Sequence, residues 1–172
     1  MSNVAGSDAI VLARQAEHRF AIVRASVLRA LWRLDVEDIE TRLARALRDP
    51  SNSLVRAANN IYCRGVISLD EPTLTSAMSG ASDHTKAALM SASQLLGKWQ
   101  ALSFLLRQCA GSDEIAANLA LGGIDRWVKR SNQRFTVAST EFARELPLLF
   151  QSARERHPTH DWRDVTGALK CL

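Results

Sequence analysis

The feature that most constrains the fold is a short motif that recurs at a spacing of about 30 residues. Residues 23–26 read VRAS and residues 55–58 read VRAA, an offset of 32. The tripeptide RAA at 56–58 is echoed by KAA at 86–88, and SDH at 82–84 is echoed by SDE at 112–114, both at an offset of 30. A period of this length containing two helices is typical of stacked helical hairpins, each of which buries its apolar face on its neighbours.

Apolar residues recur at helical spacing along almost the whole chain, and short polar breaks separate the helical segments. Helix formers dominate and β-branched and aromatic residues are sparse, so the chain is expected to be all-α. The expected helices cover about 8–15, 18–34, 35–47, 53–65, 68–81, 82–97, 98–111, 112–130 and 135–156, with a less regular tail over 157–172 in which Trp162, Val165 and Leu169 dock a short turn.

Capping residues define several of these boundaries. Asp35 is a candidate N-cap with Asp38 as its capping-box partner three residues later. Asp70 is a second candidate N-cap, with Pro72 in the first turn that follows, and Gly65 is a candidate C-cap. Small residues at the starts of the second helices predict close helix packing there; they are Ala57, Ala58, Ala87, Ala88, Ala116 and Ala117.

The segments RDPSNSLVRAANNI and AIVRASVLRALWRL resemble the second-helix signature of HEAT repeats, in particular the short bacterial HEAT-like repeats. That signature is a turn with Asp and Pro, then Val-Arg, then small residues and Leu. The resemblance is clearest at 18–34 and 49–65, and Lys86 and Thr85 replace the Arg and Val in the third copy. In the family the turn Asp commonly pairs with the Arg of its own repeat or of the next, and the resemblance implies that Asp49 and Arg56 could form such a pair.

This resemblance implies an α-α superhelix of HEAT-like hairpins in one domain, residues 1–172. The repeats would cover about 8–34, 35–65, 70–97 and 98–128, followed by a C-terminal cap over 135–172. It also implies a non-catalytic scaffold, without cofactor or metal, whose second helices hold a protein partner. The expected partner-binding residues are Arg24, Arg56, Asn59, Lys86, Arg126, Lys129, Arg130 and Arg134.

Charge keeps a nucleic-acid alternative open. Residues 11–64 and 126–172 each carry a net charge of +4, whereas 65–125 carries −3. The stretch DRWVKRSNQRF at 125–135 interleaves basic residues with Trp127 and Phe135, a pattern that suits phosphate contacts and base stacking. The same aromatics could instead anchor the core, with the basic residues covering a helix C-terminus. Asp125 and Trp127 superficially resemble the groove of HEAT-like alkylated-base DNA glycosylases, although no catalytic motif matches. An irregular helical bundle is the remaining alternative.

Other chemistry is weakly supported. His157 and His160 form an HxxH, which Cys171 or Asp161 could complete as a zinc site, but its place in a polar tail favours a solvated segment. The pair Gly122 and Gly123 indicates a helix break or a close helix approach. Three widely spaced cysteines favour a reducing, cytoplasmic location. No apolar run is long enough for a membrane span, and no signal peptide is recognised.

Overall fold

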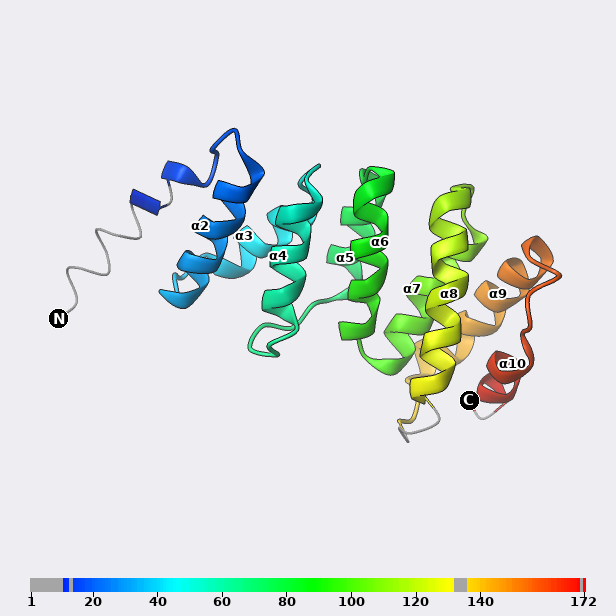
Figure 1. Ribbon diagram of the computed structural model, residues 1–172. Helices are drawn as coiled ribbons and strands as arrows, with labels where there is room; N and C mark the ends of the chain where they lie inside the picture. Colours follow the sequence, from blue (N-terminus) through cyan, green and yellow to red (C-terminus); the bar gives the residue numbers. More distant parts are fainter. Residues whose placement is uncertain (1–10, 13, 132–135, 171) are drawn as a thin grey trace. The chain divides into compact units, whose positions relative to one another are not determined.

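The computed structural model describes residues 11–12, 14–131, 136–170 and 172, and these residues divide between two compact units. Unit 1 is Met1–Leu89 and unit 2 is Met90–Leu172, so the boundary falls within a helix. Each unit is all-α over its described residues, as the sequence predicts, and Figure 1 shows the helices. In these residues no helix combines the length and apolar character needed to cross a membrane.

The helices are short and joined by turns. They are α2 (Ala21–Arg33), α3 (Ile39–Leu47), α4 (Asn52–Tyr62), α5 (Glu71–Ser79), α6 (Asp83–Ala92), the 3-10 turn η1 (Ser93–Leu95), α7 (Lys98–Ala110), α8 (Glu114–Ser131), α9 (Thr140–Arg156) and α10 (Arg163–Leu169). Residues 11, 12, 14 and 15 are helical as well.

Unit 1 is built from hairpins in two layers. Helix α2 packs on α4, and α3 packs on both α4 and α5, so α3 and α5 lie behind the layer that contains α2 and α4 (Figure 1). Ala57 and Ala58 on α4 are fully buried, in agreement with the expected close packing, whereas Ala87 on α6 is exposed, in disagreement with it. The larger buried residues of this unit include Leu31, Leu43, Leu47, Val55, Ile61 and Leu74.

Unit 2 is organised around α7, which packs against α8 on one side and α9 on another. Six consecutive residues of α7, Ala101 to Leu106, are buried. Helix α8 runs without a break through its two glycines. At the second, Gly123, an added Cβ would lie 2.5 Å from Leu105 Cδ2, so this pair of glycines provides a close helix approach.

Helix boundaries agree with the sequence where the signal is local. Asp70 Oδ1 accepts a hydrogen bond from Thr73 N at 2.8 Å, as expected of an N-cap. The prediction for Asp35 is wrong: Asp38 precedes α3, and Asp35 lies in the turn with a positive φ of 51°. Asp is among the few residues that tolerate this left-handed conformation. The prediction for Gly65 is also wrong, because the C-cap of α4 is Cys63 and Gly65, with φ 73°, follows two residues later.

The tail is more ordered than the sequence suggests. Helix α9 continues through Pro147, and α10 follows it with Trp162 and Val165 buried, as expected for a docked turn. Trp162 Nε1 donates to the carbonyl oxygen of His157 at 3.0 Å. The prediction of a solvated tail is therefore wrong for Trp162 and Val165, which are buried, although Asp161, Arg163 and Asp164 are exposed.

Candidate partner-binding surface

Arg24 is used inside unit 1. Its Nη2 lies 2.8 and 2.9 Å from the two carboxylate oxygens of Asp49, and its Nη1 donates to the carbonyl of His18 at 2.8 Å. Asp49 Oδ1 also accepts from the backbone N–H of Ser51 at 2.8 Å, directly before α4. The expected pair between Asp49 and Arg56 is thus replaced by a pair with the Arg of the preceding copy, since α2 and α4 pack side by side.

Asn59 and Lys86 are also engaged within the chain. Asn59 Nδ2 donates to the carbonyl oxygen of Ala88 at 2.8 Å, which joins α4 to α6. Lys86 is buried, with 9% of its surface exposed, and its Nζ lies 2.8 Å from Asp83 Oδ1 at the start of α6. Both residues therefore have a structural role, and their binding to a partner stays a prediction.

Arg56 differs from these three residues because it is exposed on α4. Its position matches that of Arg24 in the preceding copy of the motif, yet no ion pair is found for it among the described residues. Of the four expected partner-binding residues in unit 1, Arg56 is therefore the one that is exposed.

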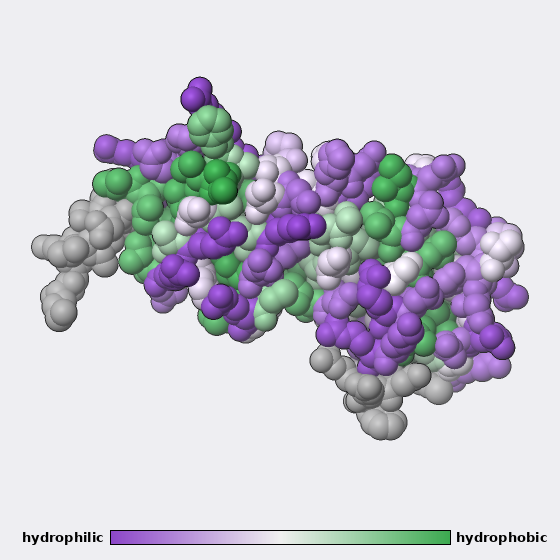
Figure 2. Space-filling view, in the orientation of Figure 1, coloured by the Kyte–Doolittle hydropathy of each residue, from purple (hydrophilic) through white to green (hydrophobic). Residues whose placement is uncertain are grey.

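Three further expected partner-binding residues lie together on α8. Arg126, Lys129 and Arg130 are all exposed, and their spacing of three and four residues places them on neighbouring positions of one helix face. We call these three residues the α8 ridge. Lys129 and Arg130 lie in the last turn of the helix, where the macrodipole favours cations. Figure 2 shows hydrophilic residues gathered over this half of α8. Arg134 lies outside the described residues.

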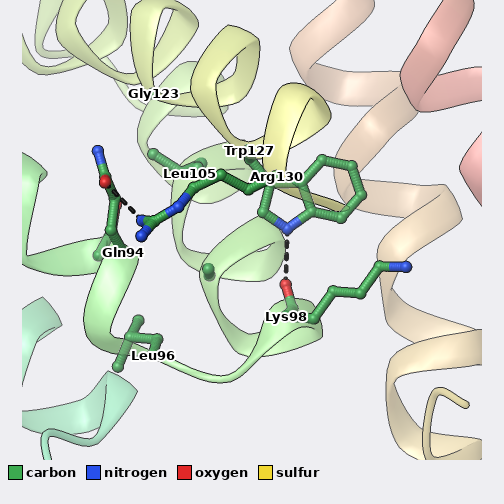
Figure 3. Close-up of a pocket in the computed structure, with 9 residues that line it drawn as sticks. Gln94, Leu96, Lys98, Leu105, Gly123, Trp127 and Arg130 are labelled. Carbon is green, nitrogen blue, oxygen red and sulfur yellow. Dashed lines mark hydrogen bonds between the residues drawn. The ribbon is translucent and has the colours of Figure 1, made fainter. Parts of the chain in front are cut away.

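A small cleft lies beside the α8 ridge. Arg130 Nη1 is 2.6 Å from Gln94 Oε1 across the cleft, and Leu96 and Leu105 form part of its apolar wall (Figure 3). Its volume of about 40 Å³ is enough for water or the end of a side chain. Sequence patterns gave no sign that Gln94 would meet Arg130, because the two residues are 36 positions apart.

Trp127, the aromatic residue between Arg126 and Lys129 on α8, points into the core. Trp127 is 7% exposed, and its Nε1 donates to the carbonyl oxygen of Lys98 at 2.7 Å (Figure 3). Its ring also lies 6.1 Å from that of Trp99, measured between centroids. A buried ring with its donor engaged cannot stack on a nucleobase. The core-anchor interpretation of Trp127 is therefore confirmed, whereas Phe135 lies outside the described residues.

The HxxH residues make separate internal contacts. His157 Nε2 lies 3.0 Å from the carbonyl oxygen of Cys109, whereas His160 Nε2 lies 3.6 Å from Asp125 Oδ1. The carboxylate of Asp161 is paired with Arg163, which holds its pKa at about 2. Over the described residues, which do not include Cys171, no cluster of His, Cys, Asp and Glu side chains forms a metal site.

Two buried groups have raised pKa values. Burial raises the pKa of the Cys109 thiol to about 12, so the thiol stays protonated and unreactive at neutral pH. Burial, assisted by the charges of Asp70 and Glu40, raises the pKa of Tyr62 to about 12. Cys109 Sγ lies 3.9 Å from the carbonyl oxygen of Ala117.

Comparison of the chain with protein-family models, curated proteins and solved structures finds no match. The functional argument therefore depends on the residues and their geometry.

Proposed function

We propose that this chain is a non-catalytic, HEAT-like helical-repeat scaffold whose α8 ridge binds an acidic surface of a protein partner. In this proposal the helical hairpins stack as a right-handed superhelix. The partner part follows from the ridge, since like charges held close together on one exposed face favour a partner of opposite sign.

One observation carries the repeat interpretation. Arg24 on α2 bonds the turn that precedes α4, and Asn59 on α4 bonds α6, so equivalent second helices are joined in sequence by polar side chains. The two ties span 25 and 29 residues, close to the period of the motif. A stack in which each hairpin contacts only its neighbours requires ties of this range.

The inward direction of Trp127 favours a protein partner over a single-stranded nucleic acid. Sequence-tolerant binding of single strands combines basic residues with exposed aromatic platforms, and this indole is buried and hydrogen-bonded. Binding to a nucleic acid through phosphate contacts alone is the second candidate function, and the exposed cations of the α8 ridge are the observation that favours it.

The two functions separate in one set of variants. The triple variant R126E/K129E/R130E reverses the charge of the α8 ridge, and R144E/R154E/R156E makes the same change at exposed positions of α9. In affinity purification from the native host, we expect a protein that the wild type and the α9 variant retain and the ridge variant loses. Purified complex should then weaken as salt rises, because the contact is electrostatic.

Duplex DNA is the discriminating ligand. If the wild type and the α9 variant bind duplex DNA at about 150 mM salt and the ridge variant does not, the α8 ridge binds a nucleic acid and not a protein. Equal binding of every ligand by the two triple variants would contradict the proposal that the α8 ridge is an interface.

The superhelix is tested by small-angle scattering, which should give an elongated profile; a compact profile would favour an irregular bundle.

A further inference from the structure

The cleft at the start of unit 1 is unrelated to the α8 ridge and is much larger than the cleft beside it. It has a volume of about 480 Å³ and lies between residues 11 and 12 and the end of α2. Four of its five lining residues are apolar; the lining is Val11, Leu12, Ala30, Arg33 and Leu34. Val11 is 60% exposed and Leu34 is 37% exposed, so the described chain leaves much of this apolar surface open.

A row of exposed residues, apolar only at its first position, runs along α2. Ile22 is 71% exposed and begins a row of exposed residues, Ser26, Arg29 and Arg33, that recur at helical spacing. The opposite face of α2 is buried against α3 and α4. Figure 2 shows hydrophobic residues gathered over the α2 end of the molecule. Helix α2 thus has a second face that no described element covers.

The charge on this face has one sign. No Asp or Glu occurs between Glu17 and Asp35 in the sequence. Arg29 and Arg33 are exposed, and neither makes an ion pair with any described residue. Arg24 on the same helix, by contrast, is paired with Asp49. The uncovered face therefore combines an apolar cleft with two exposed guanidinium groups that form no ion pair with a described residue.

We infer that this face, Val11, Leu12, Ile22, Arg29, Arg33 and Leu34, docks an amphipathic helix of a protein partner, with carboxylates flanking its apolar stripe. Apolar side chains at helical spacing would enter the cleft, and the carboxylates would bond Arg29 and Arg33. A nucleic acid is a poorer fit, because its phosphates gain nothing from an apolar lining. The proposal is independent of the α8 ridge, since the two surfaces share no residue.

The test uses the full chain and two synthetic peptides. The probe is a fluorescein-labelled 18-residue helical peptide with leucines along one face and glutamates on the flanks, and the matched peptide carries lysines in place of the glutamates. By fluorescence anisotropy, we expect the acidic peptide to bind at least tenfold more tightly. The variant R29E/R33E should lower the affinity for the acidic peptide about tenfold and raise the affinity for the basic peptide. A merely structural role of these arginines would not produce opposite changes for the two peptides.

Matched variants separate the apolar and the charged contributions. V11S/L34S should weaken both peptides, whereas L148S, at a residue of α9 that is 68% exposed, and R154E/R156E should leave both affinities unchanged. These substitutions are at exposed positions, and thermal melting confirms that each variant is folded before binding is measured.

Other outcomes overturn the proposal. Equal affinity for the two peptides, or no response to R29E/R33E, removes the acidic helix as the occupant. If the chain binds neither peptide but self-associates in ultracentrifugation, and V11S/L34S abolishes this self-association, the cleft binds a second copy of the chain. Tighter peptide binding after deletion of residues 1–10 assigns it to that segment. Oligonucleotide binding lost in R29E/R33E but kept in V11S/L34S assigns the arginines to a nucleic acid.

Discussion

The two units hold their helices together by different means. In unit 1, polar side chains join one hairpin to the next, as Arg24 does with Asp49 and Asn59 with the carbonyl of Ala88. In unit 2, large apolar residues of α7 pack against α8 and α9, and three tryptophans add polar ties to those of Arg107 with Glu145 and Arg130 with Gln94. Trp127, Trp99 and Trp162 are 6–7% exposed, and each donates its indole N–H to a backbone carbonyl.

The difference affects how each unit responds to change. A polar tie at a partly exposed position contributes a small free energy but fixes which groups are neighbours. A buried indole contributes through the apolar area it removes from water, and its N–H fixes the direction of the ring. Unit 2 should therefore lose more stability than unit 1 when one central contact is removed.

The largest effect is expected at Trp127. The substitution W127A should lower the free energy of unfolding by about 3–5 kcal/mol through loss of a buried aromatic side chain. W127F keeps much of the ring and removes the donor to Lys98 O, at a cost of about 1 kcal/mol. Denaturant titration measures both values. Hydrogen exchange then shows whether the loosening stays within residues 90–172, as the contrast between the units predicts, or extends equally to unit 1.

A smaller loss is expected at Asp49. D49A leaves Arg24, whose side chain is 17% exposed, without its carboxylate and removes the acceptor for Ser51 N. We expect a loss of about 2 kcal/mol, centred in exchange experiments on α2 and the start of α4. A double-mutant cycle with R24A should give a coupling energy of about 1–2 kcal/mol. Additive single effects would show that this ion pair does not join the two helices energetically.

Gly122 and Gly123 provide a matched pair inside α8. G123A places a Cβ 2.5 Å from Leu105 Cδ2, so we expect a net loss of about 1–2 kcal/mol even though alanine favours a helix. G122A meets only the end of Arg126, 3.7 Å away, and should stabilise by about 0.5–1 kcal/mol. Thermal melting compares the two. If G123A stabilises the protein, Leu105 moves aside. Helices α7 and α8 are then packed less tightly than the proposed difference between the two units requires.

The smallest effect is expected in the dependence of stability on alkaline pH, to which both units contribute. Tyr62 in unit 1 and Cys109 in unit 2 have pKa values raised to about 12 from ordinary values of 10.0 and 9.0. Above these ordinary values the unfolded chain releases protons that the folded chain retains, so stability falls as pH rises from 9 towards 12. For Cys109 the loss should be roughly 1 kcal/mol at pH 10, and C109A should remove it. C63S, at an exposed cysteine, is the control. An unchanged slope in C109A would contradict the prediction.

Sequence reasoning succeeded where the cause is local. The helices follow from apolar spacing, the Asp70 cap follows from a side chain three residues from its donor, and the close approach at the glycine pair follows from the absence of a Cβ. The failures involve partners distant in sequence. Whether Asp49 meets Arg24 or Arg56 depends on which helix lies beside the turn, and residue spacing does not encode this.

The candidate surface was predicted only in part for the same reason. Exposure of Arg126, Lys129 and Arg130 follows from their helical spacing and agrees with the sequence. Burial of Lys86 does not, since a lysine at a second-helix position looks solvated until the neighbouring elements are in place. The tail was misjudged because the docking of one tryptophan outweighs the polarity of the residues around it.

The central place of α7 has a consequence for synthesis of the chain. Its apolar face is completed only when α9 is present, and the end of α9 follows the end of α7 by 46 residues, from Ala110 to Arg156. At ribosomal rates of about 5–20 residues per second, α7 waits roughly 2–9 seconds for that partner. The hairpins of unit 1, whose ties span 25 and 29 residues, find their neighbours sooner. The nascent chain is therefore most exposed to aggregation and to chaperone binding while its second half is being made.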